Sequence, residues 1–334
     1  DYTSRDAIRL DSGKIVLVSE KVTVTFRSIT ISLINLDGSF SSTNIVSTDI
    51  STLGGQKQFP CICLLPDNSL IVAYWVTNNI DNLANIEIQR STDDGATWTK
   101  ISSRAIPTDI DTSSTFGAGA AGYDLDRLAI AANSSQILLL ASLNVHKTSV
   151  SNGNVMYQYA SSSEGTKFDL VTQTSESSGD GYYYADIVSY NESFIISWIY
   201  SQDSIGVTNI SNAYKSIVAA LASYDRASVS PGVNIATVTA NRLENGNYSM
   251  WIDTNARLYI MYARTAVSEI LGSFQDLQGA NYADYGKNWT HWGYTGSGSA
   301  SRRIANLPDG KLINISGVPG IGSQDLFCQF EPDG

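Results

Sequence analysis

The chain has 334 residues, of which 43% are hydrophobic and 16% are charged, and its formal net charge is −11. This composition supplies enough apolar residues for a large core and excludes a disordered chain. The acidic charge argues against nucleic acid and anionic membranes as partners, and no apolar run approaches the roughly 18 residues of a membrane span.

The residue types favour strands joined by polar turns. Ser, Thr, Asn, Gly and Tyr are abundant, whereas Lys and Glu, the usual surface residues of helices, are scarce. The three cysteines, Cys61, Cys63 and Cys328, show neither a disulfide framework nor a zinc spacing, so we expect small buried thiols.

One pattern recurs along the chain at intervals of about 60 residues. It consists of a short alternating run, a polar turn and a dense apolar strand, and each copy is predicted to open with a β-hairpin. The six copies are DAIRLDSGKIVLVSE, FPCICLLPDNSLIVAYW, DRLAIAANSSQILLLAS, YADIVSYNESFIISWIY, YSMWIDTNARLYIMYAR and RRIANLPDGKLINISG. The first apolar residues after their turns are Ile15, Leu70, Ile137, Phe194, Leu258 and Leu312.

The turns explain the hairpins, because Ser12-Gly13, Asp67-Asn68 and Asp309-Gly310 tolerate left-handed backbone conformations. In the second copy IEIQRS and WTKISS add two further strands, which gives four strands per unit. Six near-equal units of four strands predict an all-β, six-bladed β-propeller of antiparallel blades.

The stretch RSTDDGATW joins the third and fourth strands of the second unit. Its residues match the pattern Ser-x-Asp-x-Gly-x-Thr-Trp at Ser91, Asp93, Gly95, Thr97 and Trp98. That pattern is the Asp box, and the chain here resembles the sialidase-like BNR/Asp-box β-propellers. The resemblance implies a structural turn on the rim opposite the ligand-binding face, so Asp93 and Asp94 are not expected to be catalytic.

Degenerate copies of the pattern support the resemblance. ADYGKNW keeps Asp284, Gly286 and Trp289, and NLDGSF is a shortened turn. SSSEGTKF keeps Ser161, Gly165 and an aromatic residue at Phe168 but has Ser163 in place of Asp.

The whole chain, residues 1–334, is predicted to be one propeller domain. The sixth unit is short, because few residues follow Leu312, and the chain ends on the turn signal FEPDG. We therefore expect a piece of a longer protein.

The resemblance also implies what an enzyme of this type would need. The family binds a carboxylated sugar with three arginines and attacks with a tyrosine that a glutamate activates, while an aspartate is the acid/base. Tyr248, in NYSM, matches the position of the nucleophile. Arg5 stands in the first unit, where the family's first arginine motif is expected, and Arg303 offers a second version of that motif in the sixth unit. The motif is degenerate at both arginines, and no glutamate, acid/base aspartate or further arginine stands out.

The predicted ligand site gathers residues near the starts of the innermost strands. Several are basic in an acidic chain, so their convergence at one end of the central channel would create a positive site for an acidic sugar. The residues are Arg5, Lys57, Arg127, Tyr183, Tyr248, Arg302 and Arg303.

No metal site or cofactor is predicted, since the two histidines, His146 and His291, lie in different units. Calcium is the alternative, because NNIDNLAN and TDIDTSS each pair acidic and amide side chains in a polar loop.

We expect a propeller head that recognises a cell-surface or acidic glycan, as part of a larger secreted or virion-borne protein of the phage-adhesin type. Such a protein would act outside the cell or on a virion surface. The alternative is an exo-sialidase or related glycoside hydrolase, and a further alternative is a purely structural propeller module. Product release from a sialoside would distinguish the enzyme from the other two.

Overall fold

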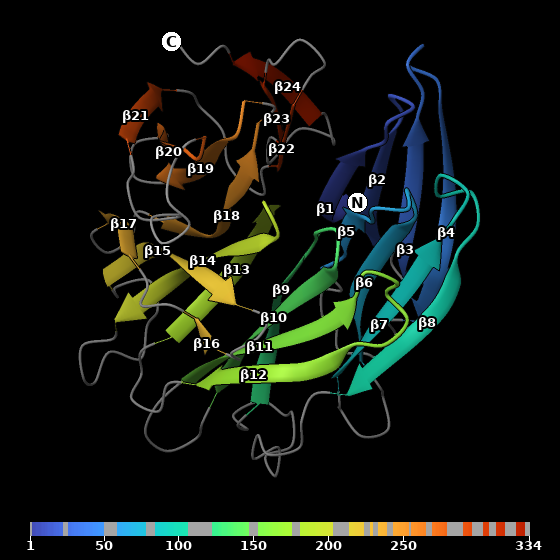
Figure 1. The fold of residues 1–334 in the computed structure, drawn as a ribbon, viewed down its shortest axis with the longest axis horizontal. Helices are drawn as coiled ribbons and strands as arrows, with labels where there is room; N and C mark the ends of the chain where they lie inside the picture. Colours follow the sequence, from blue (N-terminus) through green and yellow to red (C-terminus); the bar gives the residue numbers. More distant parts are fainter. Residues whose placement is uncertain are drawn as a thin grey trace. The chain divides into compact units, whose positions relative to one another are not determined.

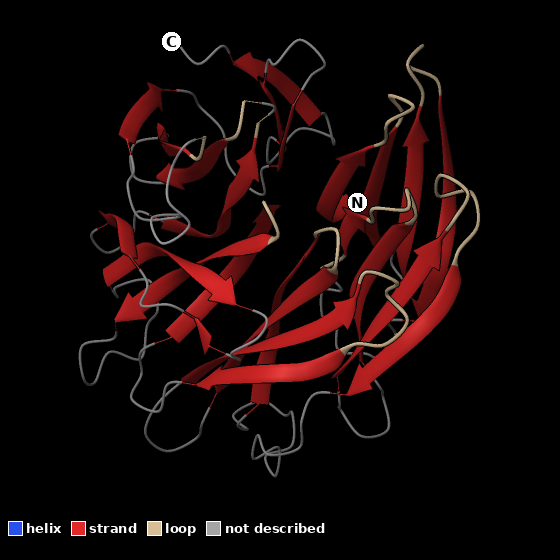
Figure 2. Cartoon of the chain, viewed as in Figure 1, coloured by secondary structure: helices blue, strands red, loops and turns tan. Residues whose placement is uncertain are grey.

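The computed structural model describes residues 2–22, 26–49, 59–77, 84–105, 122–146, 153–175, 181–202, 214–223, 228–229, 233–238, 243–253, 255–264, 269–278, 290–295, 303–306, 312–317 and 325–330. Its regular elements are all strands in this part of the chain (Figure 2). The contacts divide the chain into two compact units, Asp1–Tyr183 and Tyr184–Gly334. The single-domain assignment for residues 1–334 stays a prediction.

The first unit holds three antiparallel four-stranded sheets, each built from consecutive strands (Figure 1). Sheet 1 contains β1 (Tyr2–Arg9), β2 (Ile15–Val22), β3 (Phe26–Ile34) and β4 (Phe40–Asp49). Sheet 2 contains β5 (Cys61–Leu64), β6 (Leu70–Thr77), β7 (Ala84–Ser91) and β8 (Thr99–Ala105). Sheet 3 contains β9 (Gly122–Ala132), β10 (Gln136–His146), β11 (Gly153–Ser162) and β12 (Asp169–Ser175).

Three further sheets follow, of which sheet 4 departs from the predicted four strands and sheet 6 agrees with the predicted short sixth unit. Sheet 4 contains β13 (Gly181–Tyr190), β14 (Ser193–Gln202), β15 (Tyr214–Ser223), β16 (Ser228–Val229) and β17 (Val233–Val238), and both of the last two pair with β15. Sheet 5 contains β18 (Leu243–Ile252), β19 (Arg257–Arg264), β20 (Glu269–Asp276) and β21 (Thr290–Thr295). Sheet 6, among the described residues, contains only β22 (Arg303–Asn306), β23 (Leu312–Gly317) and β24 (Asp325–Phe330).

The hairpins that open the sheets form at the predicted turns. Gly13 has φ +83° and Asn68 has φ 64°, the left-handed conformation that both residue types tolerate. The turns are closed by matching backbone hydrogen bonds, from Leu10 N–H to the Lys14 carbonyl and from Leu65 N–H to the Ser69 carbonyl, each 2.8 Å. The Asp309-Gly310 turn lies outside the described residues.

Sheet 2 explains why its second strand is an unbroken apolar run. Alternate residues of a strand face opposite sides, and Leu70, Val72 and Tyr74 join the hydrophobic cluster with sheet 1. Ile71 and Trp75 join the cluster with sheet 3. Both faces are therefore buried between neighbouring sheets, which is the packing expected of a propeller blade.

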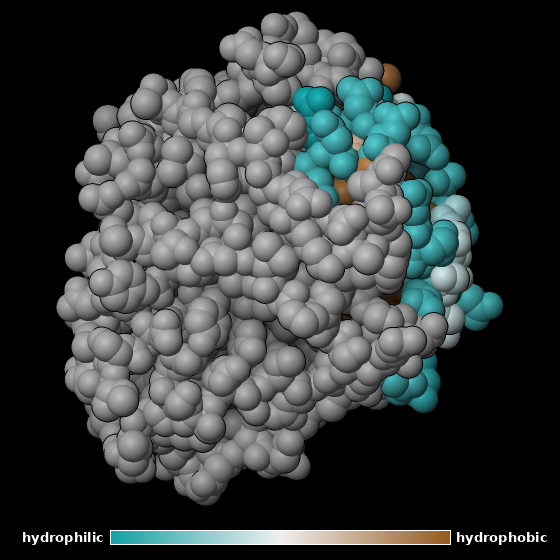
Figure 3. Space-filling view, turned by 60° about the vertical axis from the view of Figure 1, so that its left-hand side comes forward, coloured by the Kyte–Doolittle hydropathy of each residue, from teal (hydrophilic) through white to brown (hydrophobic). Residues whose placement is uncertain are grey.

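Two predicted buried thiols are confirmed, since Cys61 and Cys63 are free and buried. On the face that Figure 3 shows, the surface of the described residues is mainly hydrophilic. The exposed large hydrophobic side chains among the described residues are Leu36, in the turn between β3 and β4, and Phe40, at the start of β4.

Candidate functional site

The first strands of successive sheets lie next to one another within each unit. β5 packs against both β1 and β9, and β18 packs against β22. The sequence placed its ligand positions near the starts of these first strands. Among the described ones, Tyr183 and Arg303 do lie near the start, whereas Arg5, Arg127 and Tyr248 lie in the middle of their strands. The pairing register of each first strand with its second strand therefore shows which of these residues lie at the same level of the repeat.

Arg5 and Tyr248 occupy the same register level in their sheets. Arg5 pairs with Ser19, and Tyr248 pairs with Tyr262. In both strands an irregularity ends at this residue, between Tyr2 and Arg5 in β1 and between Leu243 and Tyr248 in β18. Register shifts of this kind include β-bulges, which re-aim the chain and are common beside functional sites.

Arg303 lies one register position further along its strand. It pairs with Ile315 in β23. Arg302 and Lys57 lie outside the described residues, and Tyr183 is in β13. The sequence prediction therefore combined residues from different levels of the repeat.

Arg127 is buried, with 8% of its surface exposed, and it takes part in interactions within the protein. It lies in the irregularity of β9, and Leu128, which pairs with Ala141, occupies the level of Arg5. Sheet 3 thus has an apolar residue at that level. Contact of Arg127 with a ligand stays a prediction.

Arg5 belongs to the first unit, whereas Tyr248 and Arg303 belong to the second. The convergence of the three on one cavity therefore also stays a prediction.

Two aspartates that the sequence reasoning missed join first strands within the units. The Asp6 carboxylate accepts hydrogen bonds from Ala7 N–H at 2.8 Å and from Ile62 N–H of β5 at 3.1 Å. The Asp186 carboxylate accepts the equivalent pair, from Ile187 N–H at 3.1 Å and from Met250 N–H of β18 at 2.9 Å.

The two aspartates have the same place in the repeat. Asp6 lies four residues before Leu10 and Asp186 lies four residues before Tyr190, and Leu10 and Tyr190 each directly precede the turn that follows the first strand. This spacing was the sequence signal that could have singled them out.

Tyrosine–carboxylate pairs occur elsewhere but are part of the core. The Tyr74 hydroxyl donates to Glu87 at 3.2 Å and accepts from the Gln89 amide at 2.6 Å. Tyr74 is fully buried, and burial, with the negative charge of Glu87 as the next cause, raises the pKa of its phenol well above the ordinary value. A buried phenol that stays protonated is a structural group rather than an activated nucleophile.

The turn around Asp93 gives each residue type of its sequence pattern a hydrogen bond or a backbone conformation to supply. Asp93 accepts hydrogen bonds from Thr97 N–H at 2.8 Å, from the Thr97 hydroxyl at 2.6 Å and from the Ser91 hydroxyl at 2.8 Å. Gly95 has φ +86°, and the Trp98 indole N–H donates to its carbonyl at 2.9 Å. The hydrogen bonds from Thr97 are the main reason that the pKa of Asp93 falls to about 2.

The same kind of turn occurs in the neighbouring sheets. In sheet 3 Gly165 has φ +65°, and Phe168 is fully buried against sheet 2. In sheet 1 the shortened turn has Asp37 accepting from Ser39 N–H and hydroxyl, and Phe40 follows it. The copy with Asp284, Gly286 and Trp289 lies outside the described residues.

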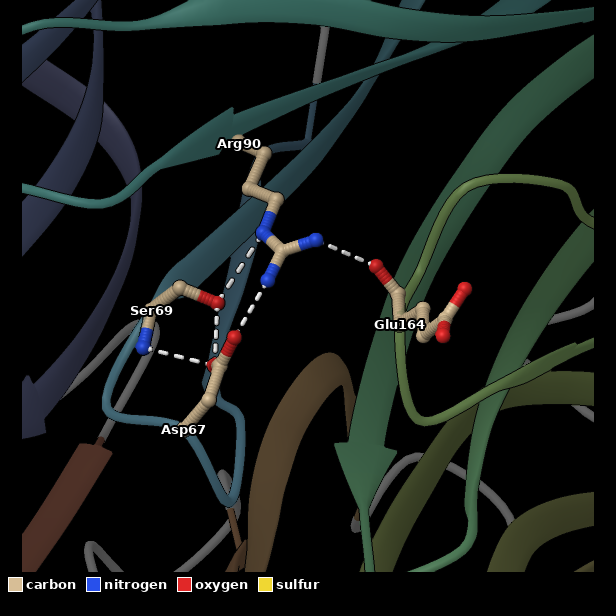
Figure 4. A network of polar contacts seen from close by, with 4 residues as sticks. All are labelled: Asp67, Ser69, Arg90 and Glu164. Atoms are coloured by element: carbon tan, nitrogen blue, oxygen red, sulfur yellow. Dashed lines mark hydrogen bonds and ion pairs between the residues drawn. The ribbon is translucent and has the colours of Figure 1, made fainter.

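A polar network connects sheet 2 to the turn of sheet 3 (Figure 4). The Arg90 guanidinium donates to the Ser69 hydroxyl at 3.0 Å, to the Asp67 carboxylate at 2.5 Å and to the Glu164 carbonyl at 2.5 Å. Lys14 of sheet 1 lies 3.5 Å from Asp94 in the turn of sheet 2. In both cases a cationic side chain of one sheet contacts the residue that precedes the turn glycine of the next sheet, Glu164 before Gly165 and Asp94 before Gly95. These contacts join neighbouring sheets and are structural.

The described residues contain no group of three or more His, Cys, Asp or Glu side chains that could hold a metal ion. Residues 78–83 and 106–121, which include most of the two calcium candidates, lie outside the described part. Within that part the structure also contains no helix suited to crossing a membrane.

No family model matches the sequence, and no curated protein matches it. Solved structures do. The α-L-arabinanase of Penicillium chrysogenum, solved with arabinobiose, has a TM-score of 0.64 and 13% identity over 99% of this chain and 93% of its own. The GH93 α-L-arabinofuranosidase of Fusarium graminearum, also solved with arabinobiose, has a TM-score of 0.58 and 14% identity over 98% of this chain and 92% of its own.

The sialidase of Trypanosoma rangeli, solved with the inhibitor DANA, has a TM-score of 0.57 and 8% identity. The match covers 99% of this chain and 55% of the sialidase. The chain has a sialidase-like β-propeller fold. This confirms the predicted fold class, whereas the count of six blades, which agrees with the six described sheets, stays a prediction along with the order of the blades around the channel.

Proposed function

We propose that this propeller is a glycoside hydrolase that binds its glycan at the level of Arg5 and Tyr248. The observation that carries the proposal is the likeness of almost the whole chain to propellers solved with arabinobiose or a sialidase inhibitor. A fold of this kind hosts more than one activity, so the inner-strand residues must decide the chemistry.

Membership of the BNR/Asp-box family belongs to the same proposal. The hydrogen-bonded turn around Asp93 and the sialidase-like fold support it. We also propose that the chain acts outside the cell, as part of a larger secreted or virion-borne protein. This proposal rests on the proposed glycan ligand.

Glycan recognition without turnover is the second candidate. The likeness to propellers solved with arabinobiose supports glycan binding in the same way, and the phenols of Tyr74 and Tyr259 bond to carboxylates inside the fold. Such a protein would bind the same class of ligand at the same level but would release no product.

The test is product release from linear arabinan, arabinobiose, a fluorogenic α-L-arabinofuranoside and a fluorogenic sialoside. The hydrolase should cleave at least one of them, and Tyr248→Phe should abolish turnover. Tyr259→Phe, on the adjacent strand, is the matched control and should retain turnover in its folded fraction. Binding on a glycan array without any cleavage would favour the second candidate.

A second experiment tests whether Arg5 binds the carboxylate of an acidic sugar. If Arg5 holds an acidic sugar, Arg5→Ala should weaken binding by about 2–5 kcal/mol, because the ligand charge loses its partner. Arg9→Ala removes an exposed arginine from the same strand and should leave binding unchanged. A neutral arabinoside as the best ligand, with no effect of Arg5→Ala, would contradict the acidic-sugar prediction.

A further inference from the structure

Among the described residues, the first strand of each sheet is an edge strand, and its backbone pairs in a ladder on one side only. Asp6 and Asp186 each accept a hydrogen bond from their own first strand and one from the next first strand. The recipients, Ile62 and Met250, both lie three residues before the residue that opens the hairpin turn. The two carboxylates therefore perform the same task in both units.

The bond from Asp186 lies close to the predicted nucleophile. Met250 is two residues after Tyr248, and Tyr248 is where regular pairing with β19 begins after the irregularity from Leu243. Between Leu243 and Tyr248, β18 does not pair residue by residue with β19. After Tyr248, the buried carboxylate of Asp186, 3% exposed, anchors β18 by accepting a charge-assisted hydrogen bond of 2.9 Å from Met250 N–H.

We propose that Asp186 is the positioning residue of Tyr248, and that Asp6 has the same role for Arg5, its neighbour in the sequence. Each carboxylate sets the register between two first strands directly beside the level that carries the ligand residues. The proposal rests on the proposed function for the role of Tyr248, but the positioning itself is a physical property that can be measured without turnover.

The experiment compares Asp186→Asn with Asp253→Asn in the full chain. Asp253 is the matched control because it follows the other end of β18 and also accepts backbone hydrogen bonds, from Asn255 and Arg257 at 2.9 and 2.8 Å. Asn places an NH₂ group where Asp186 has a second acceptor oxygen, so one of the two backbone bonds is lost. Asp186→Ser, which can still accept one hydrogen bond, replaces Asp186→Asn if that variant does not fold.

The first readout is the NMR titration of Tyr248 in protein labelled at tyrosine Cζ, with the signal assigned by its loss in Tyr248→Phe. Asp186→Asn should shift this signal and its titration midpoint, and Asp253→Asn should leave both in place. An unchanged Tyr248 signal in folded Asp186→Asn would overturn the proposal, as would an equal shift in both variants.

The second readout is kinetic, with whichever fluorogenic arabinofuranoside or sialoside the wild-type protein cleaves. Asp186→Asn should lower kcat about 100-fold, the usual effect of an ångström-scale misplacement, and KM should stay within about threefold because ground-state binding is retained. Equal losses of kcat in both variants would show general destabilisation and contradict the positioning role. Wild-type protein that cleaves neither substrate would count against the proposed function alone, and the NMR readout would still decide the positioning.

Discussion

Aspartate has one task in the turns between the third and fourth strands of a sheet, here called the outer turns, and a different task on the first strands. Asp93 in the turn of sheet 2 is exposed and bonds to residues two and four positions away, Ser91 and Thr97. Asp6 and Asp186 bond across sheets to residues 56 and 64 positions away. The first kind shapes a local turn, whereas the second kind sets how neighbouring strands align near the predicted ligand level.

The largest expected effect concerns the aromatic residue of the turn rather than its acid. Phe168→Ala should destabilise the protein by about 3–5 kcal/mol, because a fully buried ring between sheets 2 and 3 leaves a cavity. Denaturant unfolding measures this. Phe40→Ala, at the corresponding position of sheet 1 but 75% exposed, is the control and should change stability by less than about 0.5 kcal/mol. Similar losses in the two variants would show that burial of the turn aromatic does not govern its contribution.

Next in size is the loss of a cross-sheet carboxylate. Asp6→Ala should cost about 2–3 kcal/mol, since the edge N–H groups of Ala7 and Ile62 lose a charged acceptor. Asp93→Ala should cost less, because water can replace the exposed carboxylate in the turn. Urea unfolding of the two variants measures both losses of stability. A larger loss in Asp93→Ala than in Asp6→Ala would contradict the distinction between local and cross-sheet aspartates.

A substitution of Arg90 tests whether contacts between a turn and the neighbouring sheet also stabilise the protein. Arg90→Lys should cost about 1 kcal/mol, because an ammonium cannot hold the Ser69 hydroxyl, Asp67 and the Glu164 carbonyl in one planar arrangement. Lys167→Arg, beside Asp169 on the exposed surface, is the reverse exchange and should be neutral. The measurement is thermal unfolding at low and high salt, and a loss that disappears at high salt would identify the network as a purely ionic contact.

The smallest expected effect is the pH dependence from the turn. The folded pKa of Asp93, about 2, lies below the ordinary 3.8, so the folded state favours the carboxylate. Its contribution to stability is therefore present above pH 3.8 and is lost as the pH falls toward about 2. The hydrogen bonds that Ser39 donates also lower the pKa of Asp37. At Asp67 partial burial opposes the shift, but the hydrogen bonds from Ser69 and the positive charge of Arg90 outweigh it and lower the pKa.

Chemical unfolding at a series of acidic pH values measures this effect. Asp93→Asn should flatten the fall in stability within that window, and Asp94→Asn removes the same charge from the adjacent position as a control. An identical pH slope in the wild type and Asp93→Asn would show that the turn does not hold the carboxylate ionised.

Much of the fold is local in origin and was predictable. The apolar run of β6 predicts a strand buried on both faces, and Gly13 and Asn68 mark tight turns because of their own backbone preferences. The pattern around Asp93 predicts its hydrogen bonds for the same reason, since every partner lies within four residues.

The tertiary structure decided what depends on distant strands. Residue types alone could not show that Tyr74 would be fully buried beside Glu87, or that Arg303 would lie one register position beyond Arg5 and Tyr248. Nor could they show that Asp6 and Asp186 would bond to the next strand, because an aspartate in a sequence carries no record of which backbone N–H groups a neighbouring sheet brings to it. The alternation and turn chemistry of this chain determined its sheets, and the packing of one sheet against the next decided which polar residues hold those sheets together.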